Sequence, residues 1–147
     1  RLMWTEDHPT FQGEHFSIDD ASAPPLPDPV PPICIGAFGA KVGLPLVGRQ
    51  ADQWNCFYLD EADWKMRLDI VRESADQAGR DPHEIEVGTT IERALPTTDA
   101  ESEALLHHLS HLHEQEISHF TMDFGHPLTP EHVHRFKEQV MDVMRAE

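Results

Sequence analysis

From about residue 33 to the end of the chain, short apolar runs alternate with longer segments whose apolar positions recur every three or four residues. Runs of the first kind predict buried strands, and segments of the second kind predict amphipathic helices. Their regular alternation is typical of βα units, in which each strand of a parallel sheet is followed by a helix. The expected strands are 33–35, 53–56, 85–91 and 119–124, and the expected helices are 42–50, 61–78, 99–113 and 130–145.

Local signals mark the ends of three of these helices. Asp60 can cap the start of the second helix, and Gly79 follows its end. Thr98 stands three residues before Glu101, which is capping-box spacing, and residues 129–130 place an N-cap threonine before a first-turn proline. The apolar stripes expected to face the sheet are Trp64, Leu68, Val71, Ala75 and Ala78; Ala104, Leu105, Leu109 and Leu112; and Val133, Phe136, Val140, Met141 and Met144.

The first 32 residues have a different composition and lack this alternation. Residues 1–4 read as the end of a helix, and residues 5–32 are rich in proline with an acidic pair at 19–20. This composition predicts an irregular, extended insertion segment, with a small two-stranded excursion over 10–16. Such a segment before a barrel strand usually shapes the mouth of a site. We therefore divide the chain into 1–32 and a single domain over 33–147, and because it begins with Arg1 we expect a truncated piece.

Four right-handed βα units admit two architectures within the α/β class. They form half of a (β/α)8 TIM barrel, or an open four-stranded parallel sheet if the chain is complete. The spacing of the elements does not choose between the two.

Composition restricts the class of partner and the cellular compartment. The chain has 147 residues and a formal net charge of −16, which repels nucleic acid and anionic lipid. It contains no apolar stretch of the roughly 18 residues that a membrane span needs. Cys34 and Cys56 lack CxxC spacing and no secretory signal opens the chain, so we expect reduced thiols and a cytoplasmic protein.

Eleven histidines raise the question of a metal site. His107 and His111 have the i, i+4 spacing of helical zinc ligands, but no cysteine or carboxylate pattern completes a closed site. A solvated, pH-sensitive helix face is the better interpretation, and we expect no metal.

Several short motifs occur in a characteristic order along the chain, at residues 2–4, 10–13, 31–41, 51–55, 79–82 and 120–127. Together they resemble the luciferase-like monooxygenase superfamily, in particular its deazaflavin-dependent branch, and the resemblance spans essentially the whole chain. The sequence departs from the usual pattern at Ala37, where a second glycine is common, and at 43–45, where Thr-Leu-Arg is common.

The resemblance implies that the chain is the C-terminal half of the barrel and that its strands are the fifth to the eighth. It implies an oxidoreductase that uses either a deazaflavin coenzyme (F420) for hydride transfer or FMN for monooxygenation of a small-molecule substrate. The family draws much of its isoalloxazine pocket and its usual catalytic groups from the first four strands. The catalytic residues of this protein are therefore unknown from this chain.

The glycine-rich turn after the first strand is the candidate cofactor site. A turn from a strand into a helix presents unpaired backbone N–H groups and the positive end of the helix dipole, which suits a phosphate. The alternative is a plain tight turn with an exposed lysine. The residues expected to wrap the phosphate or ribityl arm of the cofactor are Gly36, Ala37, Phe38, Gly39 and Ala40, with an added charge from Lys41.

Three further residues lie near the ends of expected strands, where barrel enzymes place functional groups. Trp54 could wall the site, and the Asn55 amide could hydrogen-bond a carbonyl of the ring or substrate. The alternative is a packed tryptophan beside an asparagine that turns the chain. His126 is a candidate contact for substrate or phosphate, against the alternative of a polar loop.

A second hypothesis comes from the open edges of a half barrel. Unpaired strand edges and an apolar inner layer favour association, so the chain could be a non-catalytic binding or assembly module. We expect it to form a homo-oligomer or to pair with the missing barrel half.

Overall fold

The computed structural model describes residues 1–125 and 128–146. The chain falls into two compact units, Arg1–Pro32 and Ile33–Glu147. In the first unit, α1 (Leu2–Thr5) is followed by an antiparallel hairpin of β1 (Phe11–Gln12) and β2 (Ser17–Ile18). The expected two-stranded excursion is present, but it reaches Ile18 because Phe11 pairs with Ile18 and Gln12 with Ser17.

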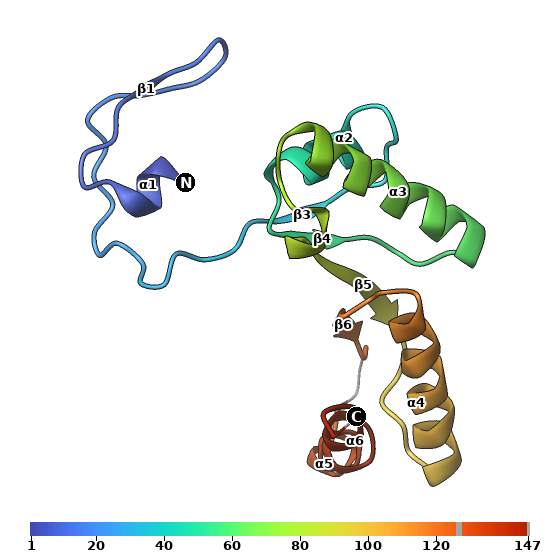
Figure 1. Ribbon diagram of the computed structural model, residues 1–147. Coiled ribbons are helices and arrows are strands. Elements are labelled where there is room, and N and C mark those ends of the chain that lie inside the picture. The colour runs from blue at the N-terminus through green and yellow to red at the C-terminus, as the bar shows by residue number, and fades with distance from the viewer. Residues whose placement is uncertain (126–127, 147) are drawn as a thin grey trace. The chain divides into compact units, whose positions relative to one another are not determined.

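The second unit is built on a four-stranded sheet in which neighbouring strands are parallel (Figure 1). The strands are β3 (Cys34–Gly36), β4 (Gln53–Asn55), β5 (Glu86–Glu92) and β6 (His119–Asp123), and they lie in this order across the sheet. The parallel α/β sheet of four successive units is therefore confirmed. The first and third strands each begin one residue later than the sequence predicts.

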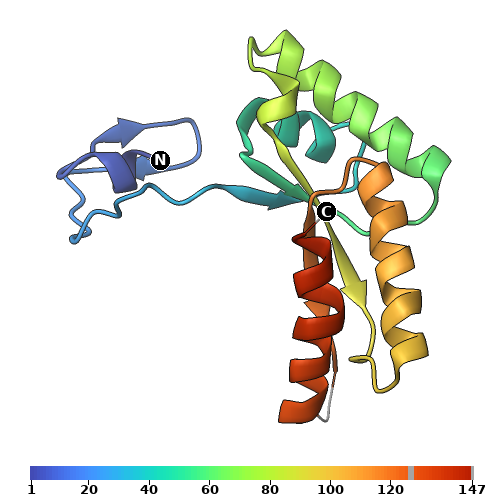
Figure 2. The ribbon, with the colours of Figure 1, turned by 60° about the horizontal axis from the view of Figure 1, so that its bottom comes forward.

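A helix follows each strand, as the alternation of the sequence predicts. The helices are α2 (Gly43–Gln50), α3 (Glu61–Gln77), α4 (Asp99–Glu114), α5 (Pro130–Phe136) and α6 (Asp142–Met144), with a 3-10 turn at Pro82–Glu84. One turn of π-helix, Lys137–Met141, joins α5 to α6, so the last predicted helix contains a widened turn. Figure 2 shows α4 running beside β5.

The predicted helix ends are confirmed by their hydrogen bonds. The Asp63 backbone N–H donates to Asp60 Oδ1 at 2.9 Å, and Thr98 forms a complete capping box with Glu101. The His132 N–H donates to Thr129 Oγ1 at 3.3 Å. Gly79 adopts a φ of +70°, a left-handed conformation that suits glycine after a helix end.

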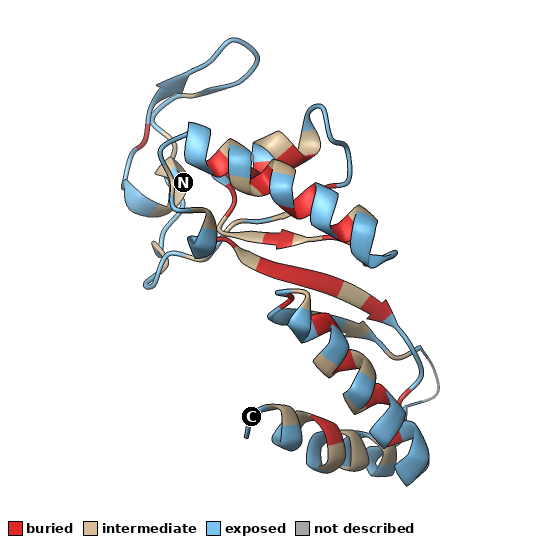
Figure 3. Cartoon of the chain, turned by 45° about the vertical axis from the view of Figure 1, so that its right-hand side comes forward, coloured by how far each residue is buried: buried red, intermediate tan, exposed pale blue. Residues whose placement is uncertain are grey.

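The core lies between the sheet and its helices, and its centre is a pair of stacked indoles. The rings of Trp54 on β4 and Trp64 on α3 have centroids 5.0 Å apart and an interplanar angle of 12°. Figure 3 shows buried residues along most of β5 and on one side of α3 and α4. The buried residues that pack around this pair include Leu44, Val47, Leu68, Val71, Val87, Leu105, Leu109, Leu112 and Ile117.

Three alanine and valine positions expected in the core are exposed. Ala78 is the C-cap of α3 and lies beyond its last buried turn. Ala104 faces outward because the buried stripe of α4 passes through Ser102 and Leu105. Val133 is 48 % exposed because the last helix contributes its buried residue, Val140, two turns later.

The two faces of the sheet differ in polarity. One face of the sheet packs into the core and carries Ile35, Trp54 and Val87, which lie in register across β3, β4 and β5. Phe120 on β6 packs into the core on the same face. Their neighbours along each strand point to the other side, which we call the open face. The open face carries Cys34, Gly36, Gln53, Asn55, Glu86, Gly88, Thr90, Glu92, His119, Thr121 and Asp123.

Within residues 1–125 and 128–146, no helix has both the length and the apolar character needed to cross a bilayer.

Candidate functional site

The connection between β3 and α2, residues 37–42, is the candidate site, and we call it the cradle loop. It leaves the sheet after Gly36 and closes onto the helix where the Leu44 N–H donates to the Gly39 carbonyl at 3.0 Å. Among the described residues, no group accepts a hydrogen bond from the backbone N–H of residues 38–41. Successive open N–H groups at the start of a helix are an arrangement that binds anions.

The space in front of the cradle loop is open. A Cβ built at Gly39 would meet no atom within 4 Å, and one built at Gly36 would meet only the Asn55 carbonyl at 3.8 Å. The side chains of Ala40 and Lys41 are exposed. A ligand can therefore approach the backbone of the loop directly.

Trp54 holds the cradle loop to the core. Its indole Nε1 donates a buried hydrogen bond of 3.0 Å to the Ala37 carbonyl, and its side chain is only 1 % exposed. The ring lies on the helix-covered face of the sheet, stacked on Trp64. The structure thus places Trp54 beneath the loop and not on the open face. This position agrees with the alternative interpretation, a packed tryptophan.

Phe38 holds the outer side of the same loop. Its ring stacks on Phe57 with centroids 6.0 Å apart, and the Arg67 guanidinium lies 5.3 Å from its centroid. Arg67 is itself fixed, because its Nε lies 2.8 Å from Asp63 Oδ2 and its Nη1 donates to Cys56 Sγ at 3.0 Å. A cation held against an aromatic ring stabilises both groups. The loop is therefore clamped between a tryptophan and an arginine.

Burial governs the Cys56 thiol beside this arginine. Burial raises the pKa of Cys56, and the hydrogen bond from Arg67 opposes that rise. Cys56 is 2 % exposed, so the thiol is a structural contact of Arg67.

Asn55 lies on the open face at the end of β4, in register with Gly36. Its Oδ1 accepts a hydrogen bond from the Thr90 hydroxyl at 3.2 Å, and its Nδ2 donates to Thr121 Oγ1 at 3.3 Å. Neither threonine is among the residues expected from the sequence. Polar residues inside two later strands, Thr90 in β5 and Thr121 in β6, were the signal that could have found them.

The match to known proteins covers nearly the whole chain. The family model described as luciferase-like monooxygenase matches residues 1–145. The chain belongs to the luciferase-like monooxygenase family.

One sequence relative and two solved structures are similar to parts or most of the chain. Over 83 residues the chain is 32 % identical to the F420-dependent glucose-6-phosphate dehydrogenase of Segniliparus rotundus, a match that covers 55 % of this chain and 24 % of that protein. An F420-dependent secondary alcohol dehydrogenase, solved with an F420-acetone adduct, is similar in fold with a TM-score of 0.75 at 21 % identity, over 97 % of this chain and 58 % of that one. A riboflavin lyase, solved with modified FMN and riboflavin, gives a TM-score of 0.73 at 10 % identity, over 94 % and 48 %. The chain thus spans less than two thirds of each protein, and the half-barrel architecture agrees with these coverages.

Two departures from the usual pattern of the luciferase-like family lie against each other in the structure. A Cβ added at Gly43 would come within 3.0 Å of the Ala37 Cβ. Alanine at position 37 thus fills space that the side chain of a larger residue at position 43 would need.

Other candidates from the sequence remain apart from the cradle loop. His107 and His111 lie on α4, and among the described residues no group of three His, Cys, Asp or Glu side chains could hold a metal ion. His126 lies outside the described residues.

The contact between Ala37 and Gly43 predicts a measurable coupling. Gly43→Ala should lower the free energy of unfolding by more in the native background than in an Ala37→Gly background, because the alanine at 37 crowds the new Cβ. In a double-mutant cycle from urea unfolding, we expect a coupling free energy of about 0.5–1 kcal/mol. Strictly additive effects would show that the two positions do not compensate each other.

The Trp54 hydrogen bond predicts a local effect on the cradle loop. Trp54→Phe removes the buried donor to Ala37 and should cost about 1–2 kcal/mol of stability. The ¹⁵N order parameters of residues 37–41 should also fall, because the loop loses its buried anchor.

Trp64→Phe is the matched control for this effect. Trp64 donates a similar bond of 2.9 Å, but to the Gln115 carbonyl at the far end of α4. This variant should lose stability without a selective fall of the ¹⁵N order parameters in the cradle loop. An equal fall in both variants would contradict the role of Trp54.

Proposed function

We propose that the cradle loop binds the phosphate-bearing arm of a deazaflavin coenzyme (F420) or FMN in a luciferase-like oxidoreductase. The open backbone N–H groups of residues 38–41 carry this proposal, because they form an anion site at the start of a helix. Lys41 adds a positive charge at the exposed end of the loop. The residues proposed to contact the cofactor are Gly36, Ala37, Phe38, Gly39, Ala40, Lys41 and Asn55, with Trp54 acting through the Ala37 carbonyl.

The residues present fit such a group in three respects. The open space at Gly39 admits a bulky anion to the backbone. The clamp formed by Trp54 and Arg67 preorganises the loop, which lowers the entropy lost on binding. The neutral amide of Asn55 lies beside Gly36 and can bind a carbonyl or hydroxyl of the same ligand.

Deazaflavin is the first choice of cofactor, and the substrate is a small organic molecule. Two of the three relatives named above are described as F420-dependent, which supports this choice. When bound, the ring supplies hydride transfer, while the protein orients it and excludes water. FMN-dependent monooxygenation is the alternative within the same family, since FMN shares the phosphate and ribityl arm and the third relative was solved with modified FMN.

A non-catalytic assembly module is the second candidate function. An apolar groove of about 630 Å³ lies beside β6, which pairs with β5 alone within the part of the chain that the structure describes. Phe120, Phe136, Val140 and Met144 are among the residues that line it. Concentration-dependent oligomers that bind neither cofactor would favour this function.

A charge placed in the cradle loop tests the proposal. Gly39→Asp should weaken binding of F420 and FMN by roughly tenfold or more in a fluorescence titration, because a carboxylate beside the open N–H groups repels a phosphate. Gly39→Asn has nearly the same shape without the charge and should lose much less. Both variants should fold, since the space at Gly39 is empty.

Two results would count against this function. Unchanged affinity in Gly39→Asp would remove the cradle loop from the cofactor site. Failure of the folded native chain to bind either cofactor would remove the proposed function of this chain and favour the assembly module.

A further inference from the structure

The open face carries a row of three polar side chains from three adjacent strands. Asn55 is the last residue of β4, Thr90 lies in the second half of β5, and Thr121 is the middle residue of β6. Thr90 Oγ1 donates to Asn55 Oδ1 at 3.2 Å, and Asn55 Nδ2 donates to Thr121 Oγ1 at 3.3 Å. The interior of a (β/α)8 barrel is usually filled with bulky apolar side chains, so a polar row at this place requires an explanation.

The hydrogen bonds of the row all run in one direction. Thr90 gives its only hydroxyl proton to Asn55, and Asn55 gives an amide proton to Thr121. Thr121 receives a bond and keeps its own proton, for which the described part of the chain provides no acceptor. Thr121 is also exposed on the open face. Because bonds in a chain polarise one another, its hydroxyl is a strengthened donor that a ligand on the open face can reach.

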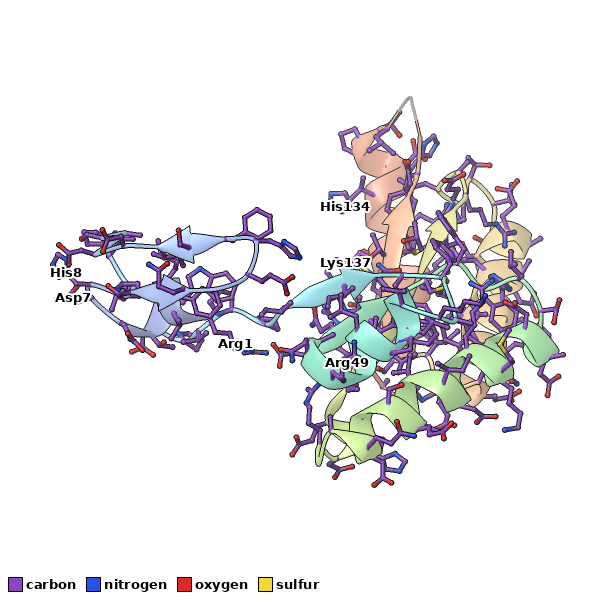
Figure 4. The ribbon with its side chains drawn as sticks, turned by 90° about the horizontal axis from the view of Figure 1, so that it is seen from above. Arg1, Asp7, His8, Arg49, His134 and Lys137 are labelled. Atoms are coloured by element: carbon purple, nitrogen blue, oxygen red, sulfur yellow. The ribbon has the colours of Figure 1, made fainter. Side chains whose placement is uncertain are left out.

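The charges around the row select the kind of acceptor. Glu92 and Asp123 are register partners just beyond the row, and Glu86 lies on the same face before it. Among the residues of the open face there is no lysine or arginine. Figure 4 shows Arg49 on α2 and Lys137 on the last helix, so these basic side chains come from helices. Three carboxylates disfavour an anionic acceptor, whereas a neutral oxygen meets no such penalty.

The row lies at a useful distance from the cradle loop. Gly36, the last residue of β3 before the loop, and Thr121 are three strands apart, which is about 14 Å along the sheet at a spacing of about 4.8 Å. A ligand with a phosphate at one end and ring carbonyls at the other, joined by an extended arm, can reach from the loop to the row.

We propose that the Thr121 hydroxyl donates a hydrogen bond to a neutral carbonyl oxygen of the cofactor ring, and that Asn55 and Thr90 hold it in that direction. The inference rests on the proposed function, since it assigns the far end of the ligand whose phosphate occupies the cradle loop. Thr121 is the contact residue, and Thr90 is a positioning residue that acts through Asn55.

Substitutions at Thr121 test this inference on the 147-residue chain. Thr121→Val keeps the β-branched shape and removes the hydroxyl, so affinity for F420 and FMN should fall roughly five- to tenfold. Thr121→Ser keeps the hydroxyl and should bind nearly as the native chain does. Thr90→Val should have a smaller effect in the same direction, rescued in Thr90→Ser. Unfolding midpoints report whether each variant is folded.

Two further measurements separate the ring contact from a structural effect and from a substrate contact. Ribose 5-phosphate carries a phosphate but no isoalloxazine ring. Its competition with FMN for the cradle loop should therefore be unchanged in Thr121→Val and weaker in Gly39→Asp. The infrared carbonyl stretch of bound FMN should lie at lower frequency in the native chain and in Thr121→Ser than in Thr121→Val, because a donor weakens the C=O bond.

The outcomes distinguish this inference from the proposed function. If Gly39→Asp weakens cofactor binding but Thr121→Val changes neither the affinity nor the carbonyl frequency, the ring contact is wrong and the phosphate site stands. If Thr121→Val weakens ribose 5-phosphate as much as FMN, its effect is structural and the inference fails. If the native chain binds no cofactor, both fail together.

Discussion

The buried hydrogen bond from the Trp54 indole to the Ala37 carbonyl is the contact on which the candidate site depends. It joins the first residue of the cradle loop to the centre of the core, where Trp54 stacks on Trp64. A buried carbonyl without its donor costs about 1–3 kcal/mol, so the loop and the indole keep one arrangement. The open N–H groups that follow, which have no hydrogen-bond acceptor among the described residues, are thereby held in place. On the other side of the loop, Arg67 against Phe38 provides the second restraint.

The two faces of the sheet have different roles in the structure. The face toward the helices holds the apolar core, and Trp54 on β4 links that core to the cradle loop. The open face is polar and carries the row formed by Asn55, Thr90 and Thr121. Under the proposed function, the open face orients the cofactor ring while the cradle loop at its edge holds the phosphate.

The elements of this fold could be read from the sequence because their signals are local. Caps such as Asp60 and the Thr98 capping box depend on residues three positions apart, and both are present as predicted. The face occupied by Trp54 could not be read, because its strand has three residues and shows too little of a two-residue period. The row on the open face could not be read either, since the register of β4, β5 and β6 brings together residues 35 and 66 positions apart. Pairings over such separations are set by the assembled sheet and not by neighbouring residues.

The central claim is that the backbone N–H groups of residues 38–41 bind a phosphate. Backbone amide chemical shifts of the ¹⁵N-labelled chain, titrated in parallel with FMN and with riboflavin, test it most directly, since the two ligands differ only in the phosphate. The account predicts saturable shifts of the amides of residues 38–41 with FMN and much smaller ones with riboflavin. Equal shifts with both ligands, or FMN shifts located elsewhere in the chain, would contradict it.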